Sequence, residues 1–329
     1  MPNDRAPLVS IIVPTYNCEG YIKQALDSIL MQECDFSYEI LIGDDASTDG
    51  TPQILLDYAA RHECIKLFLR ETNLGAAKNC WSLLMSANGK YLATLEGDDI
   101  WNSPSKLQKQ VDFLENNDDY IGCATKVDFI DKNSNRINFP KPIWIKYKKR
   151  FGIKDFKGIF LPGQPSSYVR RNIFLTLDNS LKNIADFHPM ILDRTLMLLY
   201  LTKGNFYLFG EKMSSYRVAY AECSQNSATQ KVYGKNSIEL MREYEYNIAL
   251  EELFYRLTSK KASFRTRRLM LMAECIIQKT RKNKEAKNVM RLLTSDGALP
   301  KWQYVFSVLY IIRKATLHVG TRVMFIGRD

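Results

Sequence analysis

Apolar and polar residues follow two different periods in the first 120 residues, and each period indicates one kind of element. Apolar side chains recur every three or four positions in several stretches, which is typical of amphipathic helices. Short, nearly continuous apolar runs separate these stretches and are typical of strands buried on both faces. The runs occupy residues 8–14, 38–42, 65–69 and 91–95. Strands that alternate with helices predict an α/β fold with a mostly parallel, doubly wound sheet.

Two prolines predict where helices begin. Thr51-Pro52 and Ser103-Pro104 each combine a hydroxyl residue suited to a helix N-cap with a proline suited to the first helical position. Proline is tolerated there because the N–H group that it lacks would have no partner within the helix. We therefore expect helices to start at Pro52 and at Pro104.

The pattern changes twice further along the chain. After residue 120 it becomes short extended pieces and loops rich in proline and glycine, with one strong helix expected near residues 189–203. From about residue 235 onward nearly every segment has helical periodicity. We predict two domains, residues 1–230 and residues 231–329, the second of them mostly helical.

Charge is distributed unevenly over the 329 residues, whose formal net charge is +10. Residues 231–329 hold 20 Lys+Arg against 9 Asp+Glu, whereas residues 1–230 hold 26 against 27. In residues 260–314 the basic residues accompany aromatic ones, which favours peripheral contact with an anionic membrane. A helical subdomain packed on the catalytic core explains the same pattern equally well, and nucleic acid is not an expected partner.

The cysteines and the apolar segments bear on the cellular compartment. The seven cysteines are scattered and never form Cys-x-x-Cys, which predicts reduced thiols rather than disulfides or a zinc site. No apolar leader follows Met1, and the longest apolar stretch, residues 302–312, is too short to cross a bilayer as a helix. We expect a cytoplasmic protein that is at most peripheral on the cytoplasmic face of the membrane.

Three carboxylates follow the apolar run that ends at Leu95, and they carry the most specific chemical signal. Glu96, Asp98 and Asp99 lie in one short turn, and Asp44-Asp45 ends an earlier run. Crowded carboxylates raise each other's pKa unless a cation compensates their charge. Mg²⁺ or Mn²⁺ that bridges such residues to diphosphate oxygens is the expected cofactor. A turn that caps the next helix is the alternative, although one aspartate would suffice for it.

A phosphate-binding loop of the usual kind is absent. The chain contains neither Gly-x-Gly-x-x-Gly nor the P-loop pattern, so a diphosphate would depend on the metal, on backbone amides and on cations. Lys78 follows Gly75 near an expected helix N-terminus, where free amides and positive charge coincide. A solvated surface lysine is the alternative interpretation of Lys78.

Four motifs occur in an order that resembles the family 2 glycosyltransferases, which have the GT-A fold. The motifs are Pro14-Thr15-Tyr16-Asn17, the segment Asp44 to Thr51, the segment Asn73 to Asn79, and Glu96-Gly97-Asp98-Asp99-Ile100-Trp101. The resemblance is firm over residues 8–115, looser to about residue 220 and absent beyond. It implies transfer of a sugar from a nucleotide diphosphate with inversion at the anomeric carbon.

The resemblance also implies a set of site residues. Thr15 and Tyr16 would line the base pocket, Asp45 would accept a hydrogen bond from the base, and Asp98 and Asp99 would serve the ribose and the metal. Glu96 stands where many members carry the first Asp of an Asp-x-Asp motif. The nucleotide-sugar site implied in this way comprises Pro14, Thr15, Tyr16, Asn17, Asp45, Lys78, Glu96, Gly97 and Asp98.

An inverting transfer also needs a base that takes the proton of the acceptor hydroxyl. Asp193 is the candidate, because the segment from Asp193 to Gly204 is similar to a family segment in which an Asp precedes an apolar helix. Asp186 is the rival base, and a helix-surface aspartate is the alternative role for Asp193. Family members often carry a His where this chain has Ala219. Arg217 or Tyr216 could take over that contact, or the activity could be lower.

The acceptor side is less specific. Residues 164–168, followed by Arg170-Arg171, stand where relatives have a Ser-rich acceptor segment, but a loop that feeds an edge strand is an equally good interpretation. We expect a UDP-sugar donor, a saccharide or lipid-linked saccharide acceptor, and a role in surface polysaccharide or glycolipid assembly. An inactive nucleotide-sugar or polyanion-binding protein is one alternative. A sugar-phosphate nucleotidyltransferase is another, although it would open with a Gly-rich basic motif that is absent here.

Overall fold

The computed structural model describes residues 6–142, 144–176, 192–218, 240–262, 264–280 and 284–295. The chain divides into two compact units. The first comprises residues 1–156 and 160–234, and the second comprises residues 157–159 and 235–329. The predicted domain boundary near residue 230 lies outside the described residues and stays a prediction.

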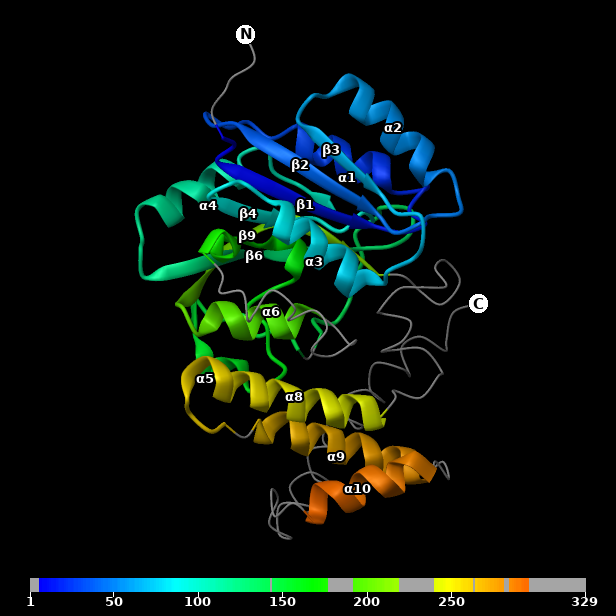
Figure 1. Cartoon of the computed structure of the whole chain (residues 1–329), viewed down its shortest axis with the longest axis vertical. Coiled ribbons are helices and arrows are strands. Elements are labelled where there is room, and N and C mark those ends of the chain that lie inside the picture. The colour runs from blue at the N-terminus through cyan, green and yellow to red at the C-terminus, as the bar shows by residue number, and fades with distance from the viewer. Residues whose placement is uncertain are drawn as a thin grey trace. The chain divides into compact units, whose positions relative to one another are not determined.

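A nine-stranded sheet forms the centre of the first unit (Figure 1). Its strands are β1 (Val9–Thr15), β2 (Tyr38–Asp44), β3 (Ile65–Leu69), β4 (Tyr91–Thr94), β5 (Ile100–Trp101), β6 (Tyr120–Ile130), β7 (Arg150–Phe151), β8 (Val169–Arg171) and β9 (Asn205–Arg217). Their order is β3-β2-β1-β4-β8-β6-β9-β5, and β7 pairs with β9. The strands from β3 to β4 are mutually parallel, so the predicted α/β fold with a mostly parallel sheet is confirmed.

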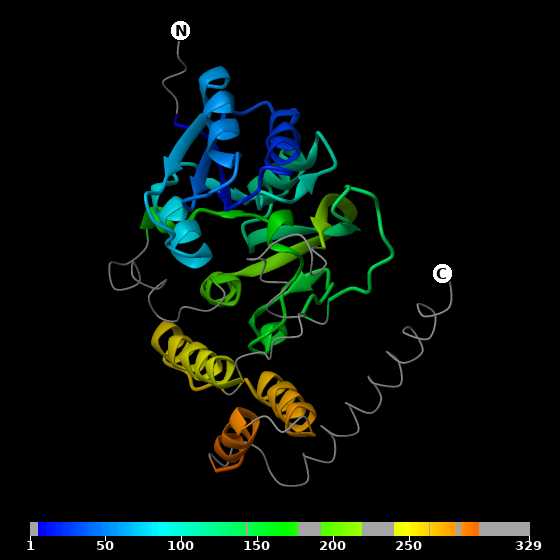
Figure 2. The ribbon, with the colours of Figure 1, turned by 90° about the vertical axis from the view of Figure 1, so that its right-hand side faces the viewer.

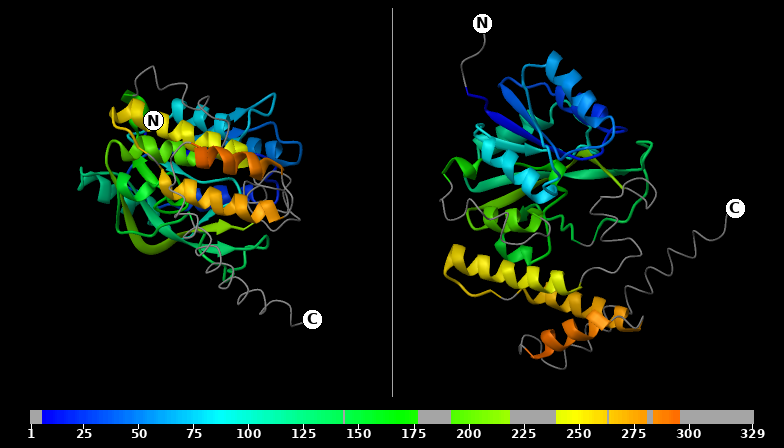
Figure 3. Two further views of the ribbon diagram at one scale, coloured as in Figure 1. Left: turned by 90° about the horizontal axis from the view of Figure 1, so that it is seen from below. Right: turned by 45° about the vertical axis from the view of Figure 1, so that its right-hand side comes forward.

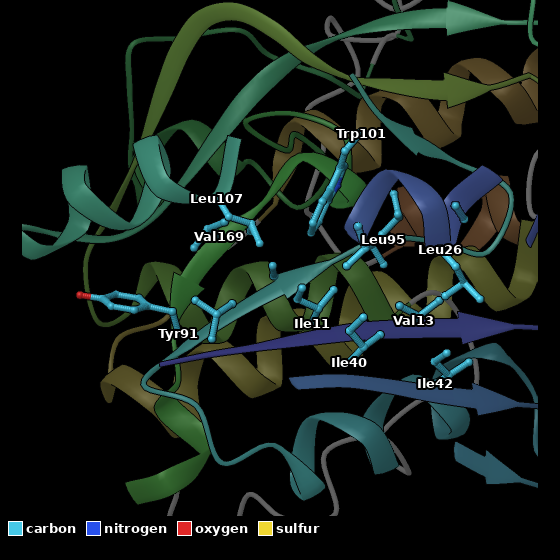
Figure 4. Close-up of a cluster of buried hydrophobic side chains, with 14 of the residues drawn as sticks. Ile11, Val13, Leu26, Ile40, Ile42, Tyr91, Leu95, Trp101, Leu107 and Val169 are labelled. Carbon is cyan, nitrogen blue, oxygen red and sulfur yellow. The ribbon is translucent and has the colours of Figure 1, made fainter. Parts of the chain in front are cut away.

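Helices cover both faces of this sheet (Figure 2). They are α1 (Ile22–Leu30), α2 (Thr51–Arg61), α3 (Ala76–Ser86), α4 (Lys106–Glu115), α5 (Ile153–Phe156), α6 (Leu192–Leu201) and the 3₁₀ helices η1 (Pro165–Ser167) and η2 (Ile173–Thr176). Side chains of α1, α2 and α4 join the parallel strands in one apolar core, which includes Leu26, Leu107 and Val169 (Figure 4). On the other face, Phe174 contacts Trp81 of α3 and Tyr200 of α6 edge to face.

Strand β8 has a central position in the sheet. It runs antiparallel between β4 and β6, with Val169 opposite both Ala93 and Cys123. The interpretation of residues 164–168 as a loop that feeds an edge strand is therefore wrong. The side chains of the preceding residues 164–168 are buried.

Both predicted helix starts differ from the observed ones. Thr51 is the first residue of α2 rather than its cap, because its hydroxyl accepts the N–H of Cys18 and the Asp49 carboxylate accepts the N–H of Thr51. Helix α4 begins at Lys106, two residues after Pro104. The carbonyl group of Pro104 accepts the N–H of Glu33, a tertiary contact that holds this residue in the preceding turn.

The second unit is helical in its described part, as predicted. Helices α8 (Leu240–Thr258), α9 (Arg265–Thr280) and α10 (Lys284–Ser295) pack on one another (Figure 3). Their core consists of Leu240, Leu271, Met272, Cys275, Val289 and Leu293. Residues 302–312, the longest apolar stretch of the sequence, lie outside the described residues.

The described residues bear on the cysteine and membrane expectations as well. Their six cysteines are free thiols, and Cys223 lies outside the described part. No helix among these residues combines the length and the apolar character needed to cross a bilayer. His62 stacks on Tyr58 in α2, with 6.0 Å between the ring centroids.

Candidate functional site

Three neighbouring parallel strands end at one edge of the sheet, and the predicted residues follow them. The register places Thr15 of β1 opposite Asp44 of β2. Asp45 donates its N–H to the carbonyl of Thr15 at 3.0 Å, and Gly97 donates to the carbonyl of Pro14 at 3.3 Å. This edge, where parallel strands end at their carboxyl termini, is where open α/β sheets bind ligands.

Gly97 allows the acidic turn to approach β1 closely. A Cβ atom at this position would lie 2.6 Å from Thr15 Oγ1 and 2.9 Å from Thr15 Cβ, both closer than real contacts allow. The hydroxyl of Thr15 is buried and has no hydrogen-bond partner among the described residues. Thr15 and Gly97 therefore lie side by side.

Asn17 joins the loops that follow β1 and β2. It adopts a left-handed backbone conformation with φ of 50°, which asparagine tolerates better than most residues. Its N–H donates to Ser47 Oγ at 2.8 Å, and its side-chain oxygen accepts the N–H of Thr48 at the same distance. The neighbouring Tyr16 is half-buried. Asn17 thus holds the wall of the predicted base pocket together.

The Asp45 carboxylate organises the loop before α3. It is buried, and it accepts the N–H groups of Leu74 at 2.7 Å and Gly75 at 2.9 Å. Each carboxylate oxygen retains a second lone pair, so contact with a nucleotide base is compatible with these bonds. Lys78 lies in the first turn of α3 with its side chain exposed.

Burial and mutual repulsion mark the acidic turn after β4. Burial and the charges of neighbouring carboxylates raise the pKa of Glu96 and of Asp99 well above their ordinary values. Burial also raises the pKa of Asp98, against the opposing charge of Arg217. Asp99 accepts the N–H of Arg217 at 2.8 Å through Oδ1, while its buried Oδ2 has no partner among the described residues. The turn thus holds more negative charge than nearby protein groups compensate.

Arg217 anchors this turn. Its Nε donates to the carbonyl of Asp98 at 2.7 Å, its Nη1 to the carbonyl of Asp131 at 2.8 Å, and its Nη2 to Gln24 Oε1 at 3.1 Å. Its guanidinium also lies 4.3 Å from the centre of the Tyr21 ring. Because all three guanidinium nitrogens donate to protein oxygens, Arg217 is poorly placed to make the ligand contact expected of the family's histidine. Ala219 itself lies outside the described residues.

Residues 164–168 hold the acidic turn through hydrogen bonds to Ser166. Glu96 donates its N–H to Ser166 Oγ at 3.2 Å, and Trp101 donates its indole N–H to the carbonyl of Ser166 at 2.8 Å. Both Ser166 and Trp101 are buried. The sequence offered no local signal for this role, because each contact joins residues at least 65 positions apart.

Asp193 lies in the first turn of α6 and is half-buried. Burial raises its pKa, and the positive charges of Arg170 and Arg194 oppose that change. The charge of Asp193 contributes to the raised pKa of Glu96, so the predicted base and the acidic turn belong to one electrostatic cluster. The rival Asp186 lies outside the described residues, as does His188.

The carboxylates of the acidic turn suit a divalent cation that takes only one or two of its ligands from the protein. The described residues contain no group of three or more His, Cys, Asp or Glu side chains arranged to hold a metal. Mg²⁺ is bound in nucleotide sites by one or two carboxylates together with phosphate oxygens, which does not require such a group. The unpartnered Oδ2 of Asp99 and the half-buried Asp98 are suitable ligands of that kind.

Comparison with known proteins assigns the first half of the chain. The family model described as Glycosyl transferase family 2 matches residues 10–177, just over half of the chain. An uncharacterized protein of Mycobacterium bovis, Mb1547, is 41% identical over 138 residues, which are 41% of this chain and 40% of that protein. TuaG of Bacillus subtilis, provisionally named a teichuronic acid biosynthesis glycosyltransferase, is 43% identical over 108 residues, 33% of this chain and 42% of TuaG. The chain thus spans about two fifths of the length of these relatives.

Solved structures share the fold at low sequence identity. Residues 1–349 of S. aureus TarS in complex with UDP-GlcNAc are 19% identical, with a TM-score of 0.56 over 89% of this chain and 81% of that one. The mannosyltransferase PcManGT from Pyrobaculum calidifontis, in complex with GDP-Man and Mn²⁺, is 16% identical, with a TM-score of 0.50 over 95% and 87%. At these identities the likeness concerns the fold alone.

Proposed function

Because the chain belongs to glycosyl transferase family 2 and has the GT-A fold, we propose that it transfers a sugar from a nucleotide diphosphate to an acceptor hydroxyl, with inversion at the anomeric carbon. One observation carries the proposal. Three carboxylates follow β4 at the ligand-binding edge of the sheet, a fourth on α6 acts electrostatically on one of them, and burial raises the pKa of all four. They are Glu96, Asp98, Asp99 and Asp193.

Asp193 is the proposed base. As the acceptor oxygen bonds to the anomeric carbon, the bond from that carbon to the phosphate oxygen breaks, and the nucleoside diphosphate leaves with the electron pair. The carboxylate of Asp193 takes the proton of the acceptor hydroxyl. Its position in the first turn of α6, in the electrostatic cluster of the acidic turn, supports this role.

The acidic turn is the proposed place of the diphosphate. Asp99 and Asp98 would hold Mg²⁺ or Mn²⁺, which when bound neutralises the charge that develops on the leaving diphosphate. Thr15, Tyr16 and Asp45 would receive the nucleoside at the ends of β1 and β2. Their adjacency at the sheet edge supports this assignment.

We propose a UDP-sugar as the donor and a saccharide or lipid-linked saccharide as the acceptor, in surface polysaccharide or glycolipid assembly on the cytoplasmic face of the membrane. The UDP-GlcNAc bound to TarS and the name of TuaG support this choice. The GDP-Man bound to PcManGT makes a guanosine donor the natural competitor. Peripheral membrane contact through residues 260–314 remains part of the proposal.

Calorimetry with nucleotides tests the proposal before the donor sugar is identified. UDP should bind the full chain more tightly with MnCl₂ than with EDTA, and GDP should bind less tightly than UDP under both conditions. A panel of nucleotide sugars, followed by release of the nucleoside diphosphate, then identifies the donor. Absence of UDP and GDP binding under both conditions would contradict the proposed donor site.

A further inference from the structure

Arg170 is a buried cation that the proposed mechanism has not yet used. It lies on β8, next to Val169, whose side chain faces the apolar core (Figure 4). Because successive side chains of a strand point to opposite faces, Arg170 faces the side of the sheet that α6 covers. Only 4% of the residue is exposed.

Few protein groups hold the Arg170 guanidinium. Its Nη2 donates to Thr94 Oγ1 at 3.2 Å, and its Cζ lies 5.0 Å from the centre of the Tyr200 ring. Its Nε is buried without a hydrogen-bond partner among the described residues. Burying a guanidinium on so few neutral contacts is costly unless a negative charge compensates it. The arrangement therefore favours a compensating negative charge in the vicinity of the guanidinium.

Asp193 supplies a negative charge on this side of the sheet, and it acts on Arg170 through space rather than in a direct ion pair. It lies seven residues before Tyr200 in α6, so both residues share the face of the helix that packs over Arg170. Of the positive charges that act on Asp193, that of Arg170 is the strongest and that of Arg194 is next. The charges of Arg170 and Asp193 also influence the pKa of Cys80 and that of Tyr168. All four residues therefore lie within electrostatic reach of one another.

Burial opposes ionisation of Asp193, because it disfavours the charged form of the carboxyl group. A base must be ionised before it can accept a proton. Arg217 serves the acidic turn, where it contacts Asp98 and Asp99, and so cannot supply this charge at α6.

We propose that Arg170 is a positioning residue that keeps Asp193 ionised and therefore able to take the proton of the acceptor hydroxyl. This inference depends on the proposed function, in which Asp193 is the base. The groups that face Asp193 and whose titration or charge must be considered are Arg170, Arg194, Glu96, Cys80 and Tyr168.

Direct titration of Asp193 tests the inference without any substrate. With ¹³C in the side-chain carboxyl groups of aspartate, the Asp193 signal is identified by its loss in Asp193→Asn. In Arg170→Gln its titration midpoint should move to higher pH, because the charged form has lost a neighbouring cation. Arg170→Lys, which keeps the charge, should stay near the wild-type midpoint.

The adjacent arginine provides a matched control. Arg171 lies on the opposite face and donates to the carbonyls of Tyr120 and Leu114, so Arg171→Gln should leave the Asp193 midpoint unchanged. A folded Arg170→Gln variant with the wild-type midpoint would overturn the inference. If Arg170→Gln does not fold, Thr94→Val loosens the guanidinium instead and should move the midpoint in the same direction by less. An unchanged midpoint there would also overturn it.

A rate profile then separates this role from a merely structural one. With the donor found by the panel, kcat on the acid side should fall about tenfold per pH unit, and Arg170→Gln should displace this limb to higher pH. The KM for the donor and the rate at high pH should match the wild type, whereas a structural defect lowers the rate at every pH. If no donor is turned over, the proposed function fails while the titration still decides the effect of Arg170 on Asp193.

Discussion

Buried charges are arranged in opposite ways in the two units of this chain. In the helical unit, the buried Arg267 donates to Glu243 at 2.9 Å and to Glu274 at 3.1 Å, and Arg268 contacts Glu251. These acids raise the pKa of Arg267, because each favours its charged form. In the sheet unit, by contrast, burial and neighbouring acids raise the pKa of Glu96 and Asp99, because nearby cations do not balance the negative charge of the acidic turn.

The difference separates structural from functional charges. A buried ion pair whose members satisfy each other holds two helices together and needs nothing further. Carboxylates that are buried together without sufficient cations are unstable by themselves, and such perturbed groups at a sheet edge indicate a binding site. The same residue types therefore have different meanings according to whether their partners lie within the protein.

The largest expected effect is on catalysis. Asp193→Asn should lower the rate of transfer by about 10²- to 10⁴-fold, the usual contribution of a general base. Affinity for UDP with Mn²⁺ should be unchanged, because the acidic turn remains intact. Nucleoside diphosphate release and calorimetry measure the two quantities. Asp57→Asn, on the exposed surface of α2, is the control, and full turnover by Asp193→Asn would exclude it as the base.

The second-largest expected effect is on the free energy of unfolding of the helical unit. Glu243→Ala leaves Arg267 with one of its two acidic partners, and loss of a partner from a buried pair costs about 3–5 kcal/mol. Chemical denaturation monitored by circular dichroism should show this loss at unchanged UDP affinity. A stability equal to that of the wild type would contradict the distinction between the two units.

A substitution in the acidic turn should raise the stability of the metal-free protein, whereas Glu243→Ala lowers stability. Asp99→Asn removes one negative charge from the cluster, so the metal-free protein should be more stable than the wild type, because Asp99 is disfavoured in its charged form. Its Mn²⁺-dependent affinity for UDP should fall by about 10- to 100-fold or more, the range known for losses around metal ligands. Thermal melts in EDTA and in UDP with Mn²⁺ test both statements, and an unaltered metal dependence would exclude Asp99 as a ligand.

The pH dependence of stability follows from the same excess charge. Because folding raises the pKa of Glu96 and Asp99, the folded state holds more protons than the unfolded state between their ordinary and their raised values. The metal-free protein should therefore lose stability as the pH rises through the raised pKa values. Melts at a series of pH values in EDTA should show this slope, and Asp99→Asn should reduce it. An equal slope in both proteins would count against the excess-charge interpretation.

The smallest effect is the control for the helical unit. Glu252 forms an exposed pair with Arg256 four residues along α8, with 51% of the Glu252 side chain accessible. Exposed pairs of this kind contribute about 0.2–1 kcal/mol. Glu252→Ala should therefore change the stability far less than Glu243→Ala in the same denaturation experiment. Equal losses would show that burial does not decide the energetic weight of these pairs.

Two predicted helix starts show where local reasoning ends. Pro52 lies at the start of α2 as its fixed φ favours, yet Gly50 is the N-cap. The Thr51 hydroxyl instead accepts the N–H of Cys18, and the Asp49 carboxylate accepts the N–H of Thr51. At Ser103-Pro104 the same local pattern precedes α4 by two residues, because the Pro104 carbonyl accepts the N–H of Glu33. A hydroxyl followed by proline thus indicates that a helix is near, whereas tertiary hydrogen bonds select its first residue.

The amino-acid sequence by itself determined the alternation of strands and helices and the place of the acidic turn after β4. Both depend on neighbours in the chain, through the period of apolar residues and the crowding of three carboxylates. Only the tertiary structure decided that Arg217 holds the acidic turn, that Ser166 supports it and that Arg170 lies buried beside α6. These contacts join residues from 30 to more than 100 positions apart, and the energy of a buried charge depends on which groups folding brings around it.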